Sequence, residues 1–195
     1  MSSRVKDKKS CCSAVEHGGE PSVTDCCAAS DAAKNPPAKK GQIDIDFMYL
    51  DLGICTRCRG AQSSLEDAIA EVSRVLETTG IRVKVRNIHI TSEQQAAELG
   101  FVVSPTIRVN NRDIQMNFRE SRCESCGTLC DCEEGVSCRE WEYQGQWYTV
   151  PPKGLIIETI LKAVYGGDGQ EAKTVEQSRR VPDSLKRFFA AAHKK

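Results

Sequence analysis

Apolar and polar positions alternate over residues 43–50, so that isoleucine, phenylalanine and tyrosine side chains share one face of a predicted strand and two aspartates lie on the other. Further along, apolar residues recur at helical spacing from Leu65 to Leu76, and Gly80 offers a left-handed stop for this helix. Alternation returns over residues 81–86 and predicts a second strand.

Shorter signals extend the same alternation of strands and helices. Ser92 and Gln95 form a capping-box pattern that starts a short helix, and Gly100 ends it. Two β-rich runs on either side of Asn110–Asn111 predict a hairpin over residues 106–118. Strands and helices that follow one another in this way favour an α/β fold with a central mixed sheet.

The last third of the folded part carries aromatic and apolar residues. Aromatic side chains flank Gln144–Gln146 and predict a two-stranded ribbon, and apolar residues at helical spacing over 155–164 predict the last core helix. Near the C-terminus, Phe188 and Phe189 lie on the apolar face of a short amphipathic helix. Because an exposed aromatic pair is unfavourable, we expect this helix to dock on its own domain, with self-association through it or docking on another protein as the alternatives.

Composition divides the chain into three parts. Residues 1–41 contain almost no large apolar side chain and are rich in Ser, Ala, Lys, Gly and Pro, which predicts a flexible arm. We predict a folded domain over residues 42–166 and a tail with the short amphipathic helix over residues 167–195. An insertion at about residues 119–140 separates the hairpin from the last core helix.

Charge and hydropathy narrow the classes of function. The chain has 27 basic and 27 acidic residues, so no global field draws it to nucleic acid or to an anionic membrane. The N-terminus leads into cysteines rather than into an apolar segment, and no apolar run is long enough to cross a bilayer. We therefore expect a cytoplasmic protein. In a reducing compartment, its eleven cysteines indicate metal ligation or thiol chemistry rather than structural disulfides.

A CxxC motif, Cys55 and Cys58, stands between the first predicted strand and the first predicted helix. This position leaves Cys55 near the helix N-terminus, where unpaired N–H groups and the positive end of the dipole favour a thiolate. Arg57 and Arg59 add positive charge beside it. We therefore predict that Cys55 is the attacking thiol and that Cys58, one turn further in, closes a disulfide on whatever Cys55 has attacked.

The insertion holds a second group of cysteines, which begins with another CxxC motif. Four converging thiolates suffice for a tetrahedral structural zinc, so we predict a zinc site built from four of these five residues. An iron–sulfur cluster uses the same residue types but ranks below zinc, because the ferredoxin spacing is missing. Free reduced thiols in a mobile loop are the remaining alternative. The five residues are Cys123, Cys126, Cys130, Cys132 and Cys138.

The predicted arm carries two vicinal pairs, Cys11–Cys12 and Cys26–Cys27, in a segment with little to pack. Adjacent cysteines form strained disulfides but can ligate a soft ion together with other thiolates. We therefore predict that the arm captures a thiophilic ion such as arsenite or mercuric ion and either delivers it to the dithiol or receives electrons from the dithiol, since tethering raises the effective concentration of the arm there. Incidental cysteines in a low-complexity tail are the alternative.

The order of elements over residues 42–166, with the CxxC motif and the later run Val-Ser-Pro-Thr-Ile, resembles the thioredoxin superfamily. The resemblance implies a thioredoxin-like fold in which Cys55 attacks, Cys58 resolves, Pro105 is a cis-proline opposite the dithiol, and Ser104 precedes it and pairs with the substrate backbone. The chain is also similar to an uncharacterised thioredoxin-like family with a cysteine-rich insertion and a Phe-Phe tail. No organic cofactor is expected from either resemblance.

Three functions from different classes follow from these patterns. The leading prediction is a thiol-disulfide oxidoreductase that acts on a thiol or disulfide protein partner and is linked to the handling of a soft metal or metalloid of the arsenic or mercury type. The alternative is a non-enzymatic metallochaperone or metal sensor that uses the cysteines as ligands. The third is a structural adaptor, against which the presence of both CxxC cysteines and the Ser-Pro motif argues.

Overall fold

The computed structural model describes residues 41–130, 136–166 and 180–192, all of which belong to one compact unit, Pro37–Lys195. Within these residues the chain forms two sheets and five helices, in a mixed α/β arrangement. Cys132 and the four cysteines of the predicted arm lie outside the described residues, as does the side chain of Cys130. None of the helices in the described ranges is long and apolar enough to span a membrane.

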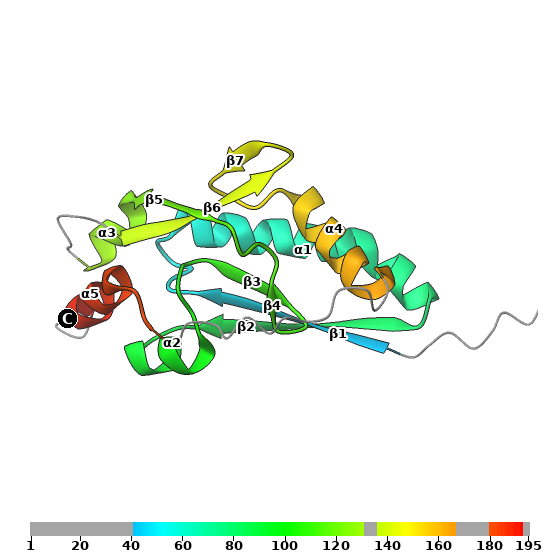
Figure 1. The fold of residues 1–195 in the computed structure, drawn as a ribbon, viewed down its shortest axis with the longest axis horizontal. Helices are drawn as coiled ribbons and strands as arrows, with labels where there is room; N and C mark the ends of the chain where they lie inside the picture. Colours follow the sequence, from blue (N-terminus) through cyan, green and yellow to red (C-terminus); the bar gives the residue numbers. More distant parts are fainter. Residues whose placement is uncertain (1–40, 131–135, 167–179, 193–195) are drawn as a thin grey trace, which may run out of the picture. The chain divides into compact units, whose positions relative to one another are not determined.

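The first sheet has the strand order β2-β1-β3-β4 (Figure 1). Its central strand β1, Gly41–Tyr49, pairs in parallel with β2, Ile81–His89, and antiparallel with β3, Thr106–Val109. The predicted alternation of residues 43–50 therefore corresponds to a central strand. Strand β1 is central in the sheet because its backbone pairs with a strand on each side. Its apolar face packs against a layer of helices.

The hairpin after β3 turns where we predict it, but its second strand is shorter than expected. Asn110 and Asn111 both adopt positive φ, 49° and 63°, as a tight hairpin turn requires. The returning strand β4 contains only Arg112–Asp113, which ends the predicted pairing over residues 113–118 early. The chain bends away here because the Asp113 carboxylate accepts the backbone N–H of Gln115 and also binds Arg139.

Two helices cover one face of this sheet. Helix α1, Thr56–Thr78, and helix α4, Lys153–Tyr165, lie on the same side of the strands (Figure 1). Both are predicted from helical spacing, and their apolar stripes pack on the isoleucine and phenylalanine face of β1. The buried side chains of this core are Ile43, Ile45, Phe47, Ala61, Leu65, Ala68, Val72, Leu76, Ile107, Val109, Trp141, Ile156 and Ile160.

A second core lies at the end of β1 and contains cysteines among its apolar side chains. Helix α2, Glu93–Leu99, begins at the predicted Ser92 cap and ends at Gly100 in the left-handed conformation. Helix α5, Asp183–Ala192, buries Phe188 and Phe189 against the same cluster, as the docking prediction expects. The other buried side chains of this second core include Met48, Leu50, Cys55, Cys58, Ile90, Phe101, Cys123, Cys126, Val136, Cys138, Val181 and Leu185.

The insertion is more regular than its sequence suggests. It forms β5, Arg119–Cys123, the short helix α3, Glu124–Cys130, and β6, Val136–Tyr143, which continues into β7, Gln146–Tyr148. These strands make a second, antiparallel sheet in the order β5-β6-β7. The predicted aromatic ribbon is thus confirmed as the β6–β7 hairpin, and β6 also pairs with a strand that the charged sequence of β5 did not indicate.

One backbone contact joins the two sheets. Ser104 and Cys138 form a parallel bridge, in which the Arg139 N–H donates to the Ser104 carbonyl at 2.9 Å. Ser104 is followed by Pro105 in a cis peptide bond. The insertion therefore lies against the chain segment just before Pro105, which is also beside the first CxxC motif.

A buried arginine anchors this junction from within. The Arg139 guanidinium is fully buried and makes two hydrogen bonds to the Asp113 carboxylate, at 2.8 and 2.9 Å. It also lies over the rings of Phe118 and Trp141, with its central carbon 4.6 and 4.4 Å from their centroids. Because a buried charge is tolerated only when it is paired and hydrogen-bonded, these contacts fix β6 next to the first sheet.

Candidate metal centre

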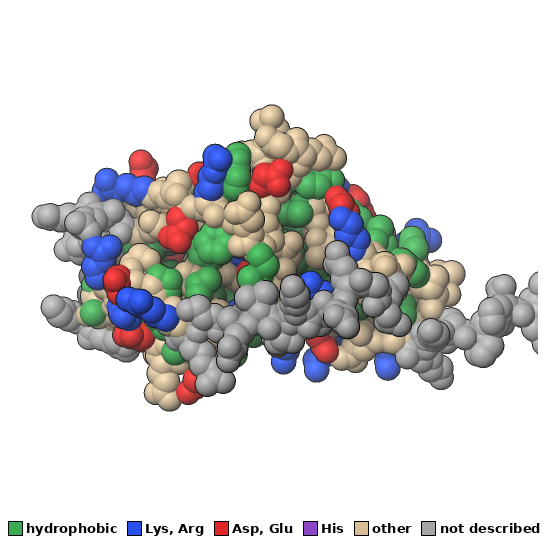
Figure 2. Space-filling view, viewed as in Figure 1, with side chains coloured by type: hydrophobic (Ala, Val, Ile, Leu, Met, Phe, Trp, Pro, Cys, Tyr) green, Lys and Arg blue, Asp and Glu red, His purple; other side chains and the backbone are tan. Residues whose placement is uncertain are grey.

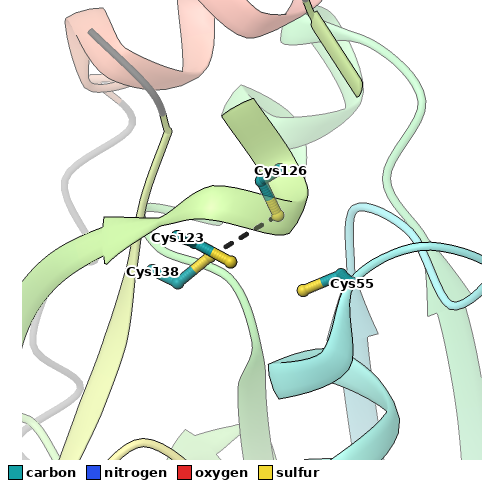
Figure 3. Close-up of side chains that lie close together, drawn as sticks. All are labelled: Cys55, Cys123, Cys126 and Cys138. Atoms are coloured by element: carbon teal, nitrogen blue, oxygen red, sulfur yellow. Dashed lines mark hydrogen bonds between the residues drawn. The ribbon is translucent and has the colours of Figure 1, made fainter. Parts of the chain in front are cut away.

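Four buried thiols converge between the start of α1 and the insertion. They belong to Cys55, Cys123, Cys126 and Cys138, and their sulfur atoms all lie within 4.8 Å of one another. Figure 3 shows the four side chains pointing toward a common centre from different segments of the chain. Each of the four residues is at most 3 % exposed. This group, the four-sulfur group, can hold a metal ion.

The separation of two sulfurs in the group, Cys126 and Cys138, matches the size of one coordinated ion. A tetrahedral site with metal–sulfur bonds of about 2.3 Å places its sulfur atoms about 3.8 Å apart. The Cys126 and Cys138 sulfurs are separated by 3.6 Å, far longer than a disulfide bond. A cluster of several iron atoms would hold its thiolates further apart, because more than one metal atom lies between them. The geometry therefore fits a mononuclear centre.

Cys55 reaches the centre from the loop between β1 and α1. It is the N-cap residue of α1, and its sulfur accepts the backbone N–H of Cys58 at 3.3 Å. Before it, the Asp51 carboxylate accepts the N–H groups of Ile54 and Cys55, which closes the loop into a tight turn. The local sequence thus directs the Cys55 sulfur toward the insertion rather than into the helix.

The other three sulfurs come from the insertion. Cys123 is the last residue of β5, Cys126 lies in the first turn of α3, and Cys138 lies in β6 opposite Ser121. A strand that runs into a short helix places the two cysteines of a CxxC motif on one side of the turn. Strand β6 then returns past them, because it pairs with β5 in an antiparallel register.

Arg57 ties the first CxxC motif to the insertion. Its guanidinium donates to the Ser121 hydroxyl at 2.8 Å, to the Arg122 carbonyl at 3.0 Å and to the Cys138 carbonyl at 3.5 Å. The hydroxyl groups of Thr56 and Ser125 are 3.4 Å apart across the same junction. These bonds hold the Cys55 side of the site against the strands that carry the other thiols.

Crowding of the four thiols separates their pKa values. Hydrogen bonds from the Cys123, Cys126 and Cys138 thiols lower the pKa of Cys55. Hydrogen bonds from Cys126 and Cys138 lower the pKa of Cys123 to about 6. In return, the hydrogen bond with Cys123 raises the pKa of both Cys126 and Cys138. Without a cation, two of the thiols therefore stay protonated and donate to the others.

Cys58 lies beside this group but is not part of it. Its sulfur is 3.4 Å from the Ser104 hydroxyl oxygen, which also accepts the Leu50 N–H at 3.3 Å. The hydrogen bond with Cys55, followed by burial, raises the pKa of Cys58. The predicted dithiol thus has two unequal members, one directed at the four-sulfur group and one at the segment before Pro105.

The structure redistributes the cysteines that the sequence assigns to two sites. Three of the five insertion cysteines join the group, and the fourth sulfur is that of Cys55, which sequence reasoning placed in the dithiol. Cys130 is the last residue of α3, with its side chain outside the described part, and Cys132 also lies outside it, as do Cys11, Cys12, Cys26 and Cys27. The sequence shows two CxxC motifs, but no pattern in it indicates that Cys55 joins the insertion cysteines.

Comparison with known proteins identifies a domain that has no assigned function. Residues 43–160 match the family model described as a domain of unknown function (DUF2703). No curated protein and no solved structure matches the chain. The matched region covers more than half of the chain and includes both CxxC motifs, Ser104, Pro105 and Cys138.

Proposed function

We propose that this chain, which belongs to the DUF2703 family, binds one thiophilic metal ion through Cys55, Cys123, Cys126 and Cys138 and acts as a non-enzymatic soft-metal protein. The observation that carries the proposal is the convergence of four buried sulfurs within 4.8 Å. Random burial of cysteines does not bring sulfurs from three separate segments to one point. A bound cation would also remove the need for two of these thiols to remain protonated.

Zinc is the ion that this ligand set favours. Four thiolates at tetrahedral spacing form a closed zinc site, in which no coordination position remains for water or substrate. Such a site stabilises a fold or senses an ion rather than activating a water molecule. Soft thiolate ligands also accept copper(I), mercuric ion and other thiophilic ions, so a role in arsenic or mercury handling belongs to the same proposal.

A thioredoxin-like arrangement is part of the proposal and has three supports. The sheet order β2-β1-β3-β4 places the parallel β1–β2 pair beside an antiparallel β3. Helix α1 begins directly after Cys55, and the Ser104–Pro105 peptide bond is cis. In this arrangement, strand β6 of the insertion lies where the superfamily pairs its substrate backbone.

Thiol-disulfide exchange is the second candidate, and one observation favours it. The Cys55 sulfur accepts a helical N–H and has a lowered pKa, which are the properties of an attacking thiolate. Against it stands the burial of Cys55 behind the insertion, where a protein disulfide does not reach it. Both candidates require reduced thiols, and we propose a cytoplasmic location for that reason.

Metal analysis of full-length protein, purified without oxygen, tests the proposal. We expect one bound ion in the wild type, and loss of that ion in each of the four variants with a serine in the four-sulfur group. Cys130→Ser and Cys132→Ser are the matched controls, because they remove insertion thiols outside the group and should retain the ion. Retention in Cys55→Ser together with loss in both controls would assign the metal to the insertion alone.

A further inference from the structure

Cys55 belongs to two sets of sulfur atoms at once. Toward the insertion it completes the four-sulfur group, and toward its own helix it faces Cys58 across the first turn of α1. A sulfur that is bonded to a metal ion has its lone pair engaged, and a sulfur in a disulfide no longer binds as a thiolate. The two states of Cys55 therefore exclude each other.

Cys58 has the position that a second state requires. Its backbone N–H donates to the Cys55 sulfur at 3.3 Å, and its side chain is fully buried, so no outside thiol competes for it. The Ser104 hydroxyl lies 3.4 Å from the Cys58 sulfur and fixes its position beside the four-sulfur group. Among the described cysteines, Cys58 is the one thiol that neighbours the four-sulfur group without belonging to it.

Cys55 is buried close to the surface of the protein. The flanking residues Ile54 and Thr56 are exposed, although the Cys55 side chain itself is not. The sulfur also lies at the N-terminus of a 23-residue helix, where the dipole stabilises a thiolate when the ion leaves or loosens. A peroxide molecule is small enough to reach such a thiol during local opening of the chain, whereas a protein disulfide is not.

We propose that the metal site, if it holds an ion as proposed above, is redox-gated: a peroxide converts Cys55 and Cys58 into a disulfide, and the ion is released. In the first step, the Cys55 thiolate attacks the peroxide O–O bond and becomes a sulfenic acid, while hydroxide leaves. In the second step, the Cys58 sulfur attacks the Cys55 sulfur, the S–S bond forms, and the Cys58 proton leaves with the hydroxyl group as water. The two sulfurs together lose two electrons, which reduce the peroxide.

Release follows from the loss of one ligand in four. Three insertion thiolates remain, and the ion gains an open position in a site that had been closed. A dithiol reductant cleaves the disulfide and restores the fourth ligand, so the change is reversible. The Cys55–Cys58 pair can form this disulfide because Cys58 is not a ligand. In the Cys123–Cys126 pair both cysteines are ligands, so neither is available to resolve a sulfenic acid while the ion is bound.

The test uses full-length protein loaded with zinc and treated with hydrogen peroxide in the presence of a chromophoric zinc chelator. We expect release of one zinc ion together with a Cys55–Cys58 disulfide in the peptide map, and rebinding after treatment with a dithiol. Cys58→Ser should bind zinc like the wild type and lose it to peroxide, but it should not rebind zinc after treatment with a dithiol, because an unresolved Cys55 sulfenic acid is oxidised further to the sulfinic acid, which a dithiol does not reduce. Its Cys55 should be trapped as the sulfenic acid by dimedone.

Two further results separate the outcomes. A full-length variant with serine at all four arm cysteines should release zinc as the wild type does, because the gate needs no thiol from residues 1–40. Equal recovery of zinc after dithiol treatment in wild type and Cys58→Ser, or a map that shows insertion disulfides with Cys58 still a free thiol, would overturn the gate while leaving the metal site intact. Absence of zinc from the untreated wild type would instead refute the metal site itself.

Discussion

The Arg57 guanidinium donates a 2.8 Å hydrogen bond to the hydroxyl of Ser121, and so joins the first CxxC motif to strand β5. Sequence reasoning assigns Arg57 to the electrostatics of the dithiol, but its donors are directed at oxygen atoms of the insertion. Arg57 therefore positions one side of the four-sulfur group against the other without contacting the ion.

We expect Arg57→Ala to weaken zinc binding by about tenfold or more, since loss of a group that orients ligands typically has that effect. Arg59→Ala is the matched control, because the Arg59 guanidinium donates within its own loop, to the Gly53 carbonyl at 3.3 Å. Competition with a chelator of known affinity measures both. Equal affinities in the two variants would show that Arg57 does not position the site.

Zinc binding should release about two protons per ion near pH 7, because the thiols with raised pKa, Cys126 and Cys138, are the ones still protonated there. The pKa of the other two, Cys55 and Cys123, is lowered, to about 6 for Cys123, so these thiols contribute fewer protons. Protons compete with zinc for the raised pair, so affinity should fall as the pH is lowered from 8 to 6. Calorimetry in buffers of different ionisation enthalpy counts the protons. A count near zero or near four would contradict this distribution.

Asp113→Asn should destabilise the fold by about 3–5 kcal/mol, because it leaves the buried Arg139 guanidinium without a counter-charge. Asp67→Asn, at an exposed position of α1, should change the free energy of unfolding by less than about 0.5 kcal/mol. Urea unfolding of both variants measures the difference. Because Arg139 follows Cys138 in β6, the Asp113 variant should also lose zinc more readily.

Phe188→Ala should accelerate the removal of zinc by a chelator. Phe188 is 4 % exposed and packs in the same cluster as the four site cysteines, so its truncation opens a cavity beside the ion. Lys186→Ala removes a neighbouring side chain that is 41 % exposed and pairs with Asp183, and this control should leave the exchange rate unchanged. Identical rates in the two variants would mean that α5 does not shield the site.

Much of the first sheet and its helices could be predicted from the sequence, because burial imposes a period on the residues that face a core. Strand β1 shows a period of two and helix α1 a helical period, and the caps at Ser92 and Gly100 appear as residue types with defined roles. Strand β4 was predicted too long, because the interaction of Asp113 with a distant arginine decides where it ends.

Figure 2 shows basic and acidic side chains interspersed over the described part of the face it presents, in keeping with equal numbers of each.

The membership of the four-sulfur group could not be predicted in the same way. Cys55 and Cys138 are brought together at the bridge between Ser104 and Cys138, where the backbone hydrogen bond from the Arg139 N–H to the Ser104 carbonyl is one that almost any residue can make. Such a contact leaves no signature in side-chain types. Strand β5 is equally hidden, because its five residues, Arg-Glu-Ser-Arg-Cys, lack apolar alternation and are strand only through pairing with β6.

The bridge at Ser104 also determines what can approach the dithiol from outside. The Ser104 carbonyl already accepts the Arg139 N–H, so its strand edge is occupied by the protein's own backbone. An extended peptide would find no unpaired acceptor there while β6 remains in place. Strand β6 of the insertion therefore occupies the edge at which an extended peptide would pair. A polypeptide substrate would first have to displace this strand, which Arg57, Asp113 and two aromatic rings hold in position.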